Sequence, residues 1–492
     1  MTVRARSVLV LLIVVTAVGV VGTVGPLASP AVPAGCDPGR PAVLHHAGGK
    51  PVTSRGYRHI PIPCALPTGF PAFESTIGVT RSGTVFYSPT VDFTNPLASI
   101  GVARSADGGT TWQRVVPMIA GAAPFHFPAD PYVYVDPTTS RVFFDTLHQP
   151  LQCGSDLSWS DDDGATWSHS FIGCPLFDDQ KLFAGPPRTS HPVGYPNVVY
   201  YCAAFPVVTQ GPGVGCMRSL DGGRTFSFRG FPYSTVEDGR RQCEGLTGDG
   251  TVGPDGSVYL AKGLCGEPYV AISRDEGATW SRVKVAQGLG IVGHVSDVGV
   301  DPAGNVYFSW VAATNRLPYL AVSRDGGRHW GRPMMIAPRG VREASLAQLA
   351  VGGRGRVALA YLGSSNAPGP PFPAGCTPAP WLCLQQGGYR EVTFDGYVTQ
   401  TTNALDADPL FMTAAINDHR DPIWRGCSPP GCNVLPATRV DYLGVDIGPD
   451  GTPWAALVDA CTDGCVGGGT GASNTFITGL VGRLYGGPSL RR

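Results

Sequence analysis

Five segments of the chain repeat one eight-residue pattern, Ser-x-Asp-x-Gly-x-(Thr/His)-(Trp/Phe). They cover residues 105–112, 160–167, 219–226, 273–280 and 323–330, and their aspartates are Asp107, Asp162, Asp221, Asp275 and Asp325. Successive aspartates are 50 to 59 residues apart. A motif that returns at a nearly constant interval of this length indicates a fold assembled from repeated structural units.

The residue types of the motif suit a tight turn between two antiparallel strands. An aspartate accepts hydrogen bonds from backbone N–H groups, a glycine takes a positive φ without strain, and the final aromatic ring covers the core. We therefore expect the five aspartates to stabilise turns rather than to bind a ligand or to catalyse a reaction.

A second unit, an apolar strand, a Gly/Asp/Pro turn and another apolar strand, precedes each motif. It occurs at residues 77–87, 133–144, 252–260, 298–310, 349–361 and 443–457, with a looser copy at 182–201. The 67 glycines and 46 prolines suit many turns, while a hydrophobic content of 43% supports a packed core. The sequence predicts an all-β, seven-bladed β-propeller of four-stranded antiparallel blades, with six blades as the alternative.

Two units depart from the pattern. In the sixth, residues 363–390 are rich in Pro and Gly, and Phe394-Asp395-Gly396 stands where a sixth turn motif is expected. The seventh, at 441–457 and 474–484, is one strand short, and residues 55–62 could supply that strand and close the ring. We divide the chain into 1–34, a leader; 35–73, a linker with the ring-closing strand; 74–485, the propeller; and 486–492, a tail.

The chain begins like an exported protein. Arg4 and Arg6 precede an uncharged, mainly apolar stretch at 7–28, which is typical of a signal peptide or of an uncleaved membrane anchor. Its 14 cysteines favour disulfides in an oxidising compartment, and nearest-neighbour pairing gives 36/64, 153/174, 202/216, 243/265, 376/383, 427/432 and 461/465. We expect a secreted monomer, with anchoring to the outer face of the membrane as the alternative.

Composition also limits the partners. Only 15% of the residues are charged and the formal net charge is -1, so the clustered positive charge that nucleic-acid binding needs is missing.

The five turn motifs resemble Asp boxes, and over residues 74–485 the chain resembles the sialidase-like Asp-box (BNR-repeat) propellers. In that family the Asp boxes lie away from the active site. Sialidases hold the carboxylate of sialic acid with three arginines, use a Tyr paired with a Glu as the nucleophile, and use an Asp as the acid/base. Asp boxes also occur in receptors and in other hydrolases, so the resemblance implies a fold more than a function.

The sialidase machinery is incomplete in this sequence. Arg58 stands in Tyr-Arg-His-Ile-Pro, where His59 interrupts the family's Phe/Tyr-Arg-Ile/Leu-Pro motif, and Glu244 is followed by no arginine up to residue 272. Arg316 is a candidate third arginine, and the candidate nucleophiles are Tyr361, Tyr389 and Tyr442. A lysine cannot replace the planar two-pronged grip of a guanidinium, so the gap argues against sialidase chemistry.

A row of acidic residues precedes the first strand of the hairpins. Relative to one apolar residue in each hairpin, Glu74, Asp130 and Asp179 lie five positions upstream, Asp249 and Asp297 three, and Asp441 six; Gln348 takes the place in the sixth unit. Because innermost strands surround a propeller's axis, these side chains should crowd one mouth of the channel. They either cap strand ends or form a ligand site, since sugar hydroxyls donate well to carboxylates.

The sequence therefore predicts an exported propeller that recognises a glycan, a glycoconjugate or a cell-surface protein through one axial face. An exo-sialidase-type glycoside hydrolase is the first alternative, and a structural interaction scaffold is the second. No cofactor is expected, although a cation at the acidic mouth remains an alternative ligand.

Overall fold

The computed structural model describes residues 32–72, 74–89, 101–115, 117, 127–149, 154–173, 178–207, 211–234, 247–292, 295–367, 392–426, 443–462, 465–466 and 478–491. The chain divides into two units, Met1–Pro33 and Ala34–Arg492, and every strand named below belongs to the second. The described residues form strands and turns without an α-helix. Within these ranges, accordingly, no helix is long and apolar enough to cross a membrane.

Six of the sheets contain four antiparallel strands each. In pairing order they are β4 (Ile77–Val79), β5 (Val85–Tyr87), β6 (Val102–Ser105) and β7 (Gln113–Val115); β8 (Phe127–Val135), β9 (Val142–Gln149), β10 (Ser155–Ser160) and β11 (Ser168–Ile172); β12 (Asp178–Gly185), β13 (Val198–Val207), β14 (Gly211–Ser219) and β15 (Ser227–Tyr233); β16 (Gly250–Val252), β17 (Val258–Leu264), β18 (Glu267–Ser273) and β19 (Ser281–Lys284); β20 (Ser296–Val300), β21 (Val306–Val311), β22 (Pro318–Ser323) and β23 (Met334–Met335); and β29 (Gly444–Ile447), β30 (Pro453–Asp459), β31 (Thr478–Tyr485) and β3 (Ile62–Pro71).

The remaining sheet has seven strands. Its path runs β2 (Lys50–Val52), β1 (Val43–His46), β27 (Leu410–Ala415), β26 (Thr393–Thr401), β25 (Val357–Ser364) and β24 (Glu343–Val351), and β28 (Trp424–Arg425) pairs with β26.

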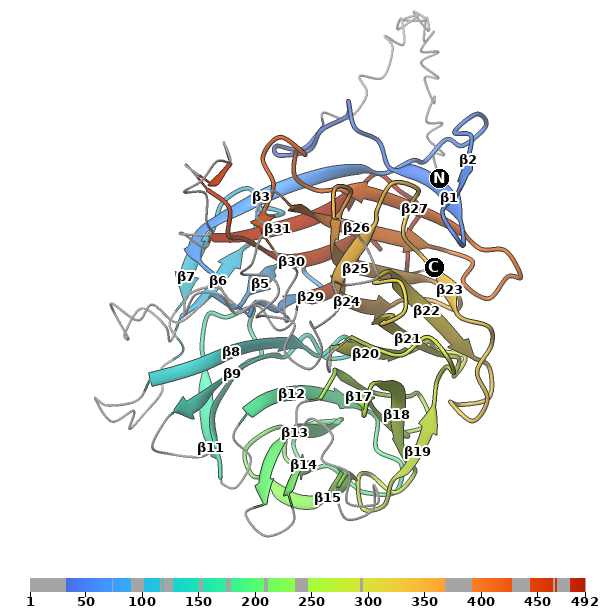
Figure 1. Cartoon of the computed structure of the whole chain (residues 1–492). Coiled ribbons are helices and arrows are strands. Elements are labelled where there is room, and N and C mark those ends of the chain that lie inside the picture. Colours follow the sequence, from blue (N-terminus) through green and yellow to red (C-terminus); the bar gives the residue numbers. More distant parts are fainter. Residues whose placement is uncertain are drawn as a thin grey trace, which may run out of the picture. The chain divides into compact units, whose positions relative to one another are not determined.

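The sheets are arranged as a propeller (Figure 1). The first strand of each sheet contacts the first strand of the next, in the order β4, β8, β12, β16, β20, β24, β29 and back to β4. The predicted all-β propeller of four-stranded antiparallel blades is thus confirmed for six sheets, and β24 of the seven-stranded sheet takes its own place in the ring between β20 and β29.

Neighbouring inner strands pack very closely around the axis. A Cβ added to Gly78 of β4 would lie 2.4 Å from Cγ2 of Val135 on β8, and one added to Gly444 of β29 would lie 2.6 Å from Cα of Thr76. No real Cβ approaches its neighbours so closely, so glycine is the residue that fits at these two contacts.

The five turn motifs share one hydrogen-bonding pattern. In the second motif, Asp162 accepts from the hydroxyl of Ser160 (2.8 Å) and from the backbone N–H (2.8 Å) and hydroxyl (2.6 Å) of Thr166. These bonds hold the pKa of Asp162 at about 2. Gly164 has a φ of 82°, and a Cβ there would lie 2.9 Å from the ring of Phe86. This geometry is that of a turn-stabilising residue.

The sixth turn lies elsewhere than the sequence indicated. Phe394-Asp395-Gly396 belongs to strand β26, so its assignment as a turn was wrong. The turn follows at Thr401 instead. Thr401 pairs with Val357 on β25, the second strand of its sheet, just as Ser160 of the second motif pairs with Val142 on β9. Asn403 takes the part of the aspartate: its side-chain oxygen accepts from the Thr401 hydroxyl (3.1 Å) and from the backbone N–H of Leu410 (3.0 Å).

The N-terminal part of the chain is more ordered than the expected linker. β1 pairs with β27 and β2 with β1, which extends one sheet by a hairpin. His45 of this hairpin is buried and bonds the Thr413 hydroxyl (2.9 Å). The strand that completes the last sheet is β3, which pairs with β31 and begins at Ile62, where the segment proposed for this purpose, 55–62, ends.

Three disulfides lie within the described ranges. They join Cys36 to Cys64, Cys202 to Cys216 and Cys461 to Cys465, which confirms three of the expected pairings. Cys265 is also disulfide-bonded. The other expected pairings involve residues outside the described ranges. Bridges of this number suit an oxidising compartment.

Replacement of Asp162 by alanine tests the role of the turn motif. The exposed turn would lose acceptors for a backbone N–H and two hydroxyls, so we expect Asp162→Ala to lower the free energy of unfolding by about 1 kcal/mol, as the loss of a helix cap does. Urea denaturation measures this change. Asp408→Ala, at another exposed aspartate, should change stability by less than about 0.5 kcal/mol. Equal stability of the two variants would contradict the turn role.

Candidate functional site

Cross-strand pairing defines equivalent positions on the inner strands. Val135 of β8 pairs with Val142 of β9, which pairs with Ser160 at the start of a turn motif, and the other sheets repeat this alignment. Six polar residues lie three positions before the residue equivalent to Val135: Thr76, Tyr132, Lys181, Asp249, Asp297 and Gln348. They come from six consecutive sheets of the ring and occupy one level around the axis. Thr76 accepts from the backbone N–H of Val133 on the neighbouring strand (2.6 Å).

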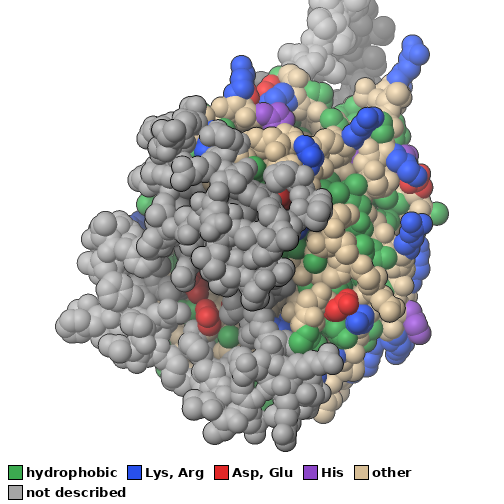
Figure 2. All heavy atoms as spheres, viewed as in Figure 1, with side chains coloured by type: hydrophobic (Ala, Val, Ile, Leu, Met, Phe, Trp, Pro, Cys, Tyr) green, Lys and Arg blue, Asp and Glu red, His purple; other side chains and the backbone are tan. Residues whose placement is uncertain are grey.

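This level lies at the opposite end of the sheets from the turn motifs. Each inner strand begins there, whereas the motifs connect the third and fourth strands of antiparallel sheets. In the view of Figure 1, basic side chains gather along the edge that carries β22 and β23 (Figure 2).

Contacts across the axis show that the other five side chains converge. The Tyr132 hydroxyl donates to Oδ1 of Asp249 (3.2 Å), although a whole sheet separates their strands in the ring. With its amide nitrogen turned toward the carboxylates, Gln348 donates to Oδ2 of Asp249 (2.5 Å) and to Oδ2 of Asp297 (3.0 Å). We call Tyr132, Asp179, Lys181, Asp249, Asp297 and Gln348 the axial cluster.

A buried ion pair adjoins these contacts. Nζ of Lys181 lies 2.7 Å from Oδ1 of Asp179, and both side chains are at most 5% exposed. The second oxygen of Asp179 accepts from the backbone N–H of Thr247 (2.6 Å). Lys181 thus places a positive charge among the carboxylates.

The inner strands are irregular where they enter the cluster. Three inner strands have a bulge that spans four residues: 129–132 on β8, 178–181 on β12 and 345–348 on β24. The second residue of each bulge has a positive φ: Asp130 (45°), Asp179 (51°) and Leu346 (58°). Bulges of this kind re-aim side chains and are over-represented beside functional sites.

Burial changes how these groups ionise. It raises the pKa of Asp249, against the opposing charge of Lys181, and burial together with the charge of Asp249 raises the pKa of Asp297 well above its usual range. Burial alone would lower the pKa of Lys181, but the charges of Asp179 and Asp249 raise it above its usual value. Lys181 therefore stays cationic, while Asp297 holds a proton more tightly than an ordinary aspartate.

The predicted acidic mouth is brought together in large part. Asp179, Asp249, Asp297 and Gln348 belong to the cluster through the contacts above. Glu74 is buried and lies near enough to raise the pKa of Lys181, and Asp130 is half-buried with its backbone carbonyl bonded by Gln180. Asp441 lies outside the described ranges.

No contact between described residues joins Arg58 or Arg316, the arginines expected for a sialidase, to the axial cluster. Arg58 is exposed in a bend before β3. Arg316, in the turn between β21 and β22, bonds the buried Glu343 (3.2 Å), so its charge compensates an internal carboxylate. Tyr361 is fully buried, and burial raises its pKa well above the usual value, which disfavours a nucleophilic role. Glu244, Tyr389 and Tyr442 lie outside the described ranges.

Sequence reasoning missed Lys181, Tyr132 and the buried Asp145. Asp145 pairs across the sheet with Tyr132 and accepts from Gln180 (3.0 Å), and burial raises its pKa well above the usual range. Lys181 and Tyr132 could have been found from the position three residues before the residue equivalent to Val135, because both align there with Asp249. The bulges obscure this alignment in the sequence, because they place the acidic residues Asp130 and Asp179 two positions further upstream.

The cluster offers hydrogen-bond acceptors, a carboxyl that retains a proton and one ammonium donor around an axis. Such a set suits a polyhydroxylated ligand, whose hydroxyls both donate and accept. Among the described residues, no group of three His, Cys, Asp or Glu side chains is placed to hold a metal ion.

No model of a known protein family matches the chain, and no curated protein matches it either. Solved structures do match. Hadza microbial sialidase Hz136 is 22% identical, with 60% of this chain and 63% of that chain covered and a TM-score of 0.42. A mutant of NanB sialidase from Streptococcus pneumoniae is 11% identical, with 90% and 92% covered and a TM-score of 0.42.

An α-L-arabinanase of Penicillium chrysogenum, complexed with arabinobiose, is 13% identical over 65% of this chain and 93% of that chain, with a TM-score of 0.39. This chain spans less than two thirds of the length of sialidase Hz136. At TM-scores below 0.5, these likenesses do not bear on what the chain binds or on whether it catalyses a reaction.

Removal of the Lys181 charge tests the energetics of the axial cluster. Lys181→Met leaves Asp179 buried without its partner, so we expect the free energy of unfolding to fall by about 3 to 5 kcal/mol. Lys50→Met, in the exposed β1–β2 hairpin, is the control and should be nearly neutral. Denaturant unfolding of both variants measures the difference. A loss below about 1 kcal/mol at Lys181 would mean that the ion pair does not hold the cluster together.

Proposed function

We propose that the chain is an exported propeller that recognises a glycan through the axial cluster. The observation that carries the proposal is the convergence of Tyr132, Asp249 and Gln348 across the axis, from sheets that are not neighbours. Strand-end capping would require each carboxylate to bond only the backbone of its own or the adjacent sheet. Asp297 accepts from the backbone N–H of Leu349 on the adjacent sheet (2.8 Å), but it also accepts from the side chain of Gln348. Asp249 bonds side chains on two sheets that are not its neighbours in the ring.

The chemistry of the cluster favours a sugar over an anionic ligand. Several carboxylates face one ammonium, so a negatively charged group would meet net repulsion, whereas sugar hydroxyls can donate to Asp249 and accept from Lys181. The resemblance of the turn motifs to Asp boxes supports the propeller fold and does not by itself favour one ligand over another. The disulfides support export.

Glycan-array screening of the full chain, followed by calorimetry, tests this function. We expect binding of at least one neutral or basic glycan, and a loss of at least tenfold in affinity in Asp249→Asn, because that change removes a charged acceptor while keeping its shape. Asp408→Asn, at the opposite end of the sheets, should bind as the parent does. Binding that survives in Asp249→Asn would contradict the proposed site, and the absence of any bound glycan would favour the interaction scaffold.

A glycoside hydrolase acting at the same cluster is the second candidate. It is favoured by Asp297, whose raised pKa keeps a carboxyl protonated closer to neutral pH, as a general acid requires. If neutral aryl glycosides are hydrolysed, Asp297→Asn should lower the rate by about 10²-fold or more.

Sialosides should not be hydrolysed. The substrate's carboxylate needs bidentate guanidinium contacts, but Arg58 is exposed in a bend and Arg316 is paired with Glu343. We therefore expect no release of fluorophore from a fluorogenic sialoside above the level given by heat-denatured protein. Rapid release that is abolished by Arg58→Ala would contradict this expectation, whereas release unaffected by that change would point to another site.

A further inference from the structure

A groove runs along strand β22, between its sheet and the β1–β2 hairpin. It has a volume of about 800 Å³, and ligand sites commonly have about 300 to 1,000 Å³. Three segments far apart in the sequence form its walls: the hairpin at residues 47–50, strands β22 and β23, and the connection 404–408 between β26 and β27. The lining extends from Tyr319 of β22 to Arg324, which follows that strand, and five residue steps of a strand measure about 17 Å.

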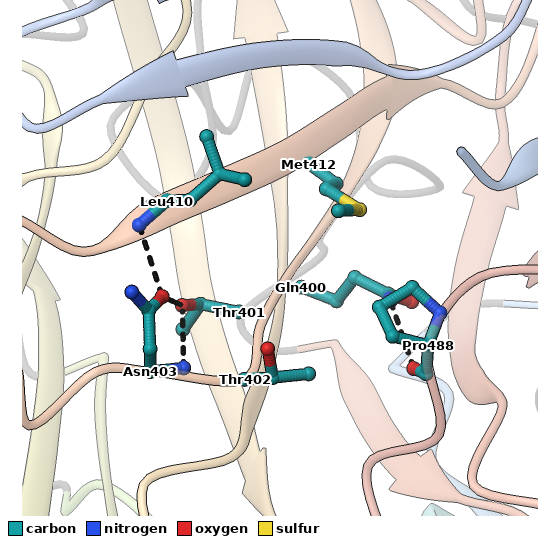
Figure 3. A pocket seen from close by; sticks show the side chains of 7 residues that line it. All are labelled: Gln400, Thr401, Thr402, Asn403, Leu410, Met412 and Pro488. Carbon is teal, nitrogen blue, oxygen red and sulfur yellow. Dashed lines mark hydrogen bonds between the residues drawn. The ribbon is translucent and has the colours of Figure 1, made fainter. Parts of the chain in front are cut away.

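The walls of the groove are held in place by hydrogen bonds. The backbone N–H of Gly48 donates to the backbone oxygen of Met335 (2.9 Å), which ties the hairpin to β23. Asn403 holds the connection between β26 and β27 at both of its ends (Figure 3). Arg324 donates to the backbone oxygen of Leu405 in the same connection. The groove is therefore preformed, which lowers the cost of ordering it around a ligand.

The lining offers an apolar surface that a ligand can reach. Its large apolar side chains are all half-buried rather than fully buried, and they are Leu289, Tyr319, Val322, Met334, Met335 and Leu405. Two of the six methionines of the chain are among them. Methionine side chains are unbranched and flexible, so they adapt to the shape of an apolar ligand. A ligand that covers these side chains removes apolar surface from water, which favours binding.

Positive charge gathers around this groove. Residues 324–342 contain a single acidic residue and five exposed arginines, which are Arg324, Arg328, Arg332, Arg339 and Arg342. They belong to the edge along which basic side chains gather in Figure 2. Arg324 and Arg332 line the groove together with Lys50, and neither Arg332 nor Lys50 forms an ion pair with another described residue. These cations can therefore pair with an anionic group of a ligand.

The groove also contains two carboxylates, and both have partners within the chain. Asp406 accepts from the side-chain nitrogen of Asn403 (2.8 Å), and Asp408 lies 3.3 Å from Nδ1 of His46. A cationic ligand would compete with these partners and would be repelled by the three cations of the lining. The groove therefore favours an anion.

The length and polarity of the groove match one hydrocarbon chain with a charged end. Tyr319 and Met335 pair with each other near the start of β22. Arg324 and Arg332 lie toward the other end, one directly after β22 and one just before its antiparallel partner β23. The acyl chain of one bilayer leaflet is about 15 Å long, half of the ~30 Å hydrocarbon core. This length is close to that of the groove.

We propose that this groove binds a single long-chain fatty acid, with its hydrocarbon chain along β22 on Tyr319, Met334 and Met335 and its carboxylate at Arg324 and Arg332. A guanidinium suits this head group because its planar N–H donors match the two oxygens of a carboxylate. The site is independent of the axial cluster and of the glycan recognition proposed there.

Isothermal titration calorimetry of the full chain with monomeric dodecanoate tests the proposal. We expect a Kd of about 10 to 100 μM, the range for a ligand of this size. Octanoate, which is four methylenes shorter, should bind at least tenfold more weakly, because each buried methylene strengthens binding. Dodecyltrimethylammonium keeps the chain but reverses the charge, so it should also bind at least tenfold more weakly.

Substitutions test the two ends of the ligand separately. Arg332→Gln should weaken dodecanoate binding at least tenfold, whereas Arg328→Gln, at an exposed arginine outside the lining, is the matched control and should not. Met334→Gln has nearly the shape of the parent residue and should weaken binding several-fold, with an unchanged melting temperature, by placing an amide against the hydrocarbon chain. Asp249→Asn should leave binding unchanged, which separates this test from that of the axial cluster.

The proposal is overturned if dodecanoate does not bind at about 1 mM (~10 times the upper Kd expected), if octanoate or dodecyltrimethylammonium binds as tightly, or if Arg332→Gln and Met334→Gln both bind like the parent. Tighter binding of a decapeptide of alternating Glu and Leu would identify a peptide site instead. Binding to phosphatidylglycerol vesicles without binding of monomeric dodecanoate would identify a membrane-docking surface. Either result would contradict a fatty-acid site.

Discussion

The close packing of neighbouring inner strands is the contact on which the rest of this fold depends. The strands converge toward the axis, and at Gly78 and Gly444 there is no room for a side chain between one strand and the next. The space beside each of these glycines is filled instead by the neighbouring inner strand, at Gly78 by the side chain of Val135. Because the inner strands pack so closely around the axis, Tyr132, Asp249 and Gln348 reach one another from sheets that are not neighbours in the ring.

Crowding several carboxylates in one buried place has to be balanced by other groups. Here the balance comes from the Lys181 ammonium, from the amide of Gln348 and the hydroxyl of Tyr132, and from the raised pKa of Asp249 and Asp297. A cluster that served only to end strands would be more stable with fewer charges. The axial cluster holds more ionisable groups than strand capping needs, and this excess supports the proposal that it also contacts a ligand.

Most of the fold could be predicted from the sequence because its repeated contacts are local. The turn motifs and the hairpins that precede them follow from spacing and residue type, and the structure has a strand pair at each of them. The β1–β2 hairpin could not be found in this way, because its partner, β27, is more than 360 residues away. The sixth turn was misplaced because Thr401 and Asn403 make the hydrogen bonds that Ser and Asp make in the other turns, and the sequence motif does not include these two residue types. In the candidate site, the acidic residues were visible, but the bulges hid Lys181 and Tyr132.

The last sheet is built from both ends of the chain, since β3 precedes the first repeat and its partner β31 follows the last. All seven inner strands precede β31 in the sequence, so they can be in place before β31 pairs with β3. Until β31 is made, the edges of β3 and β30 that it will cover are open. The finished ring therefore has a single late step, and the nascent chain carries an unpaired edge strand through almost the whole of its synthesis.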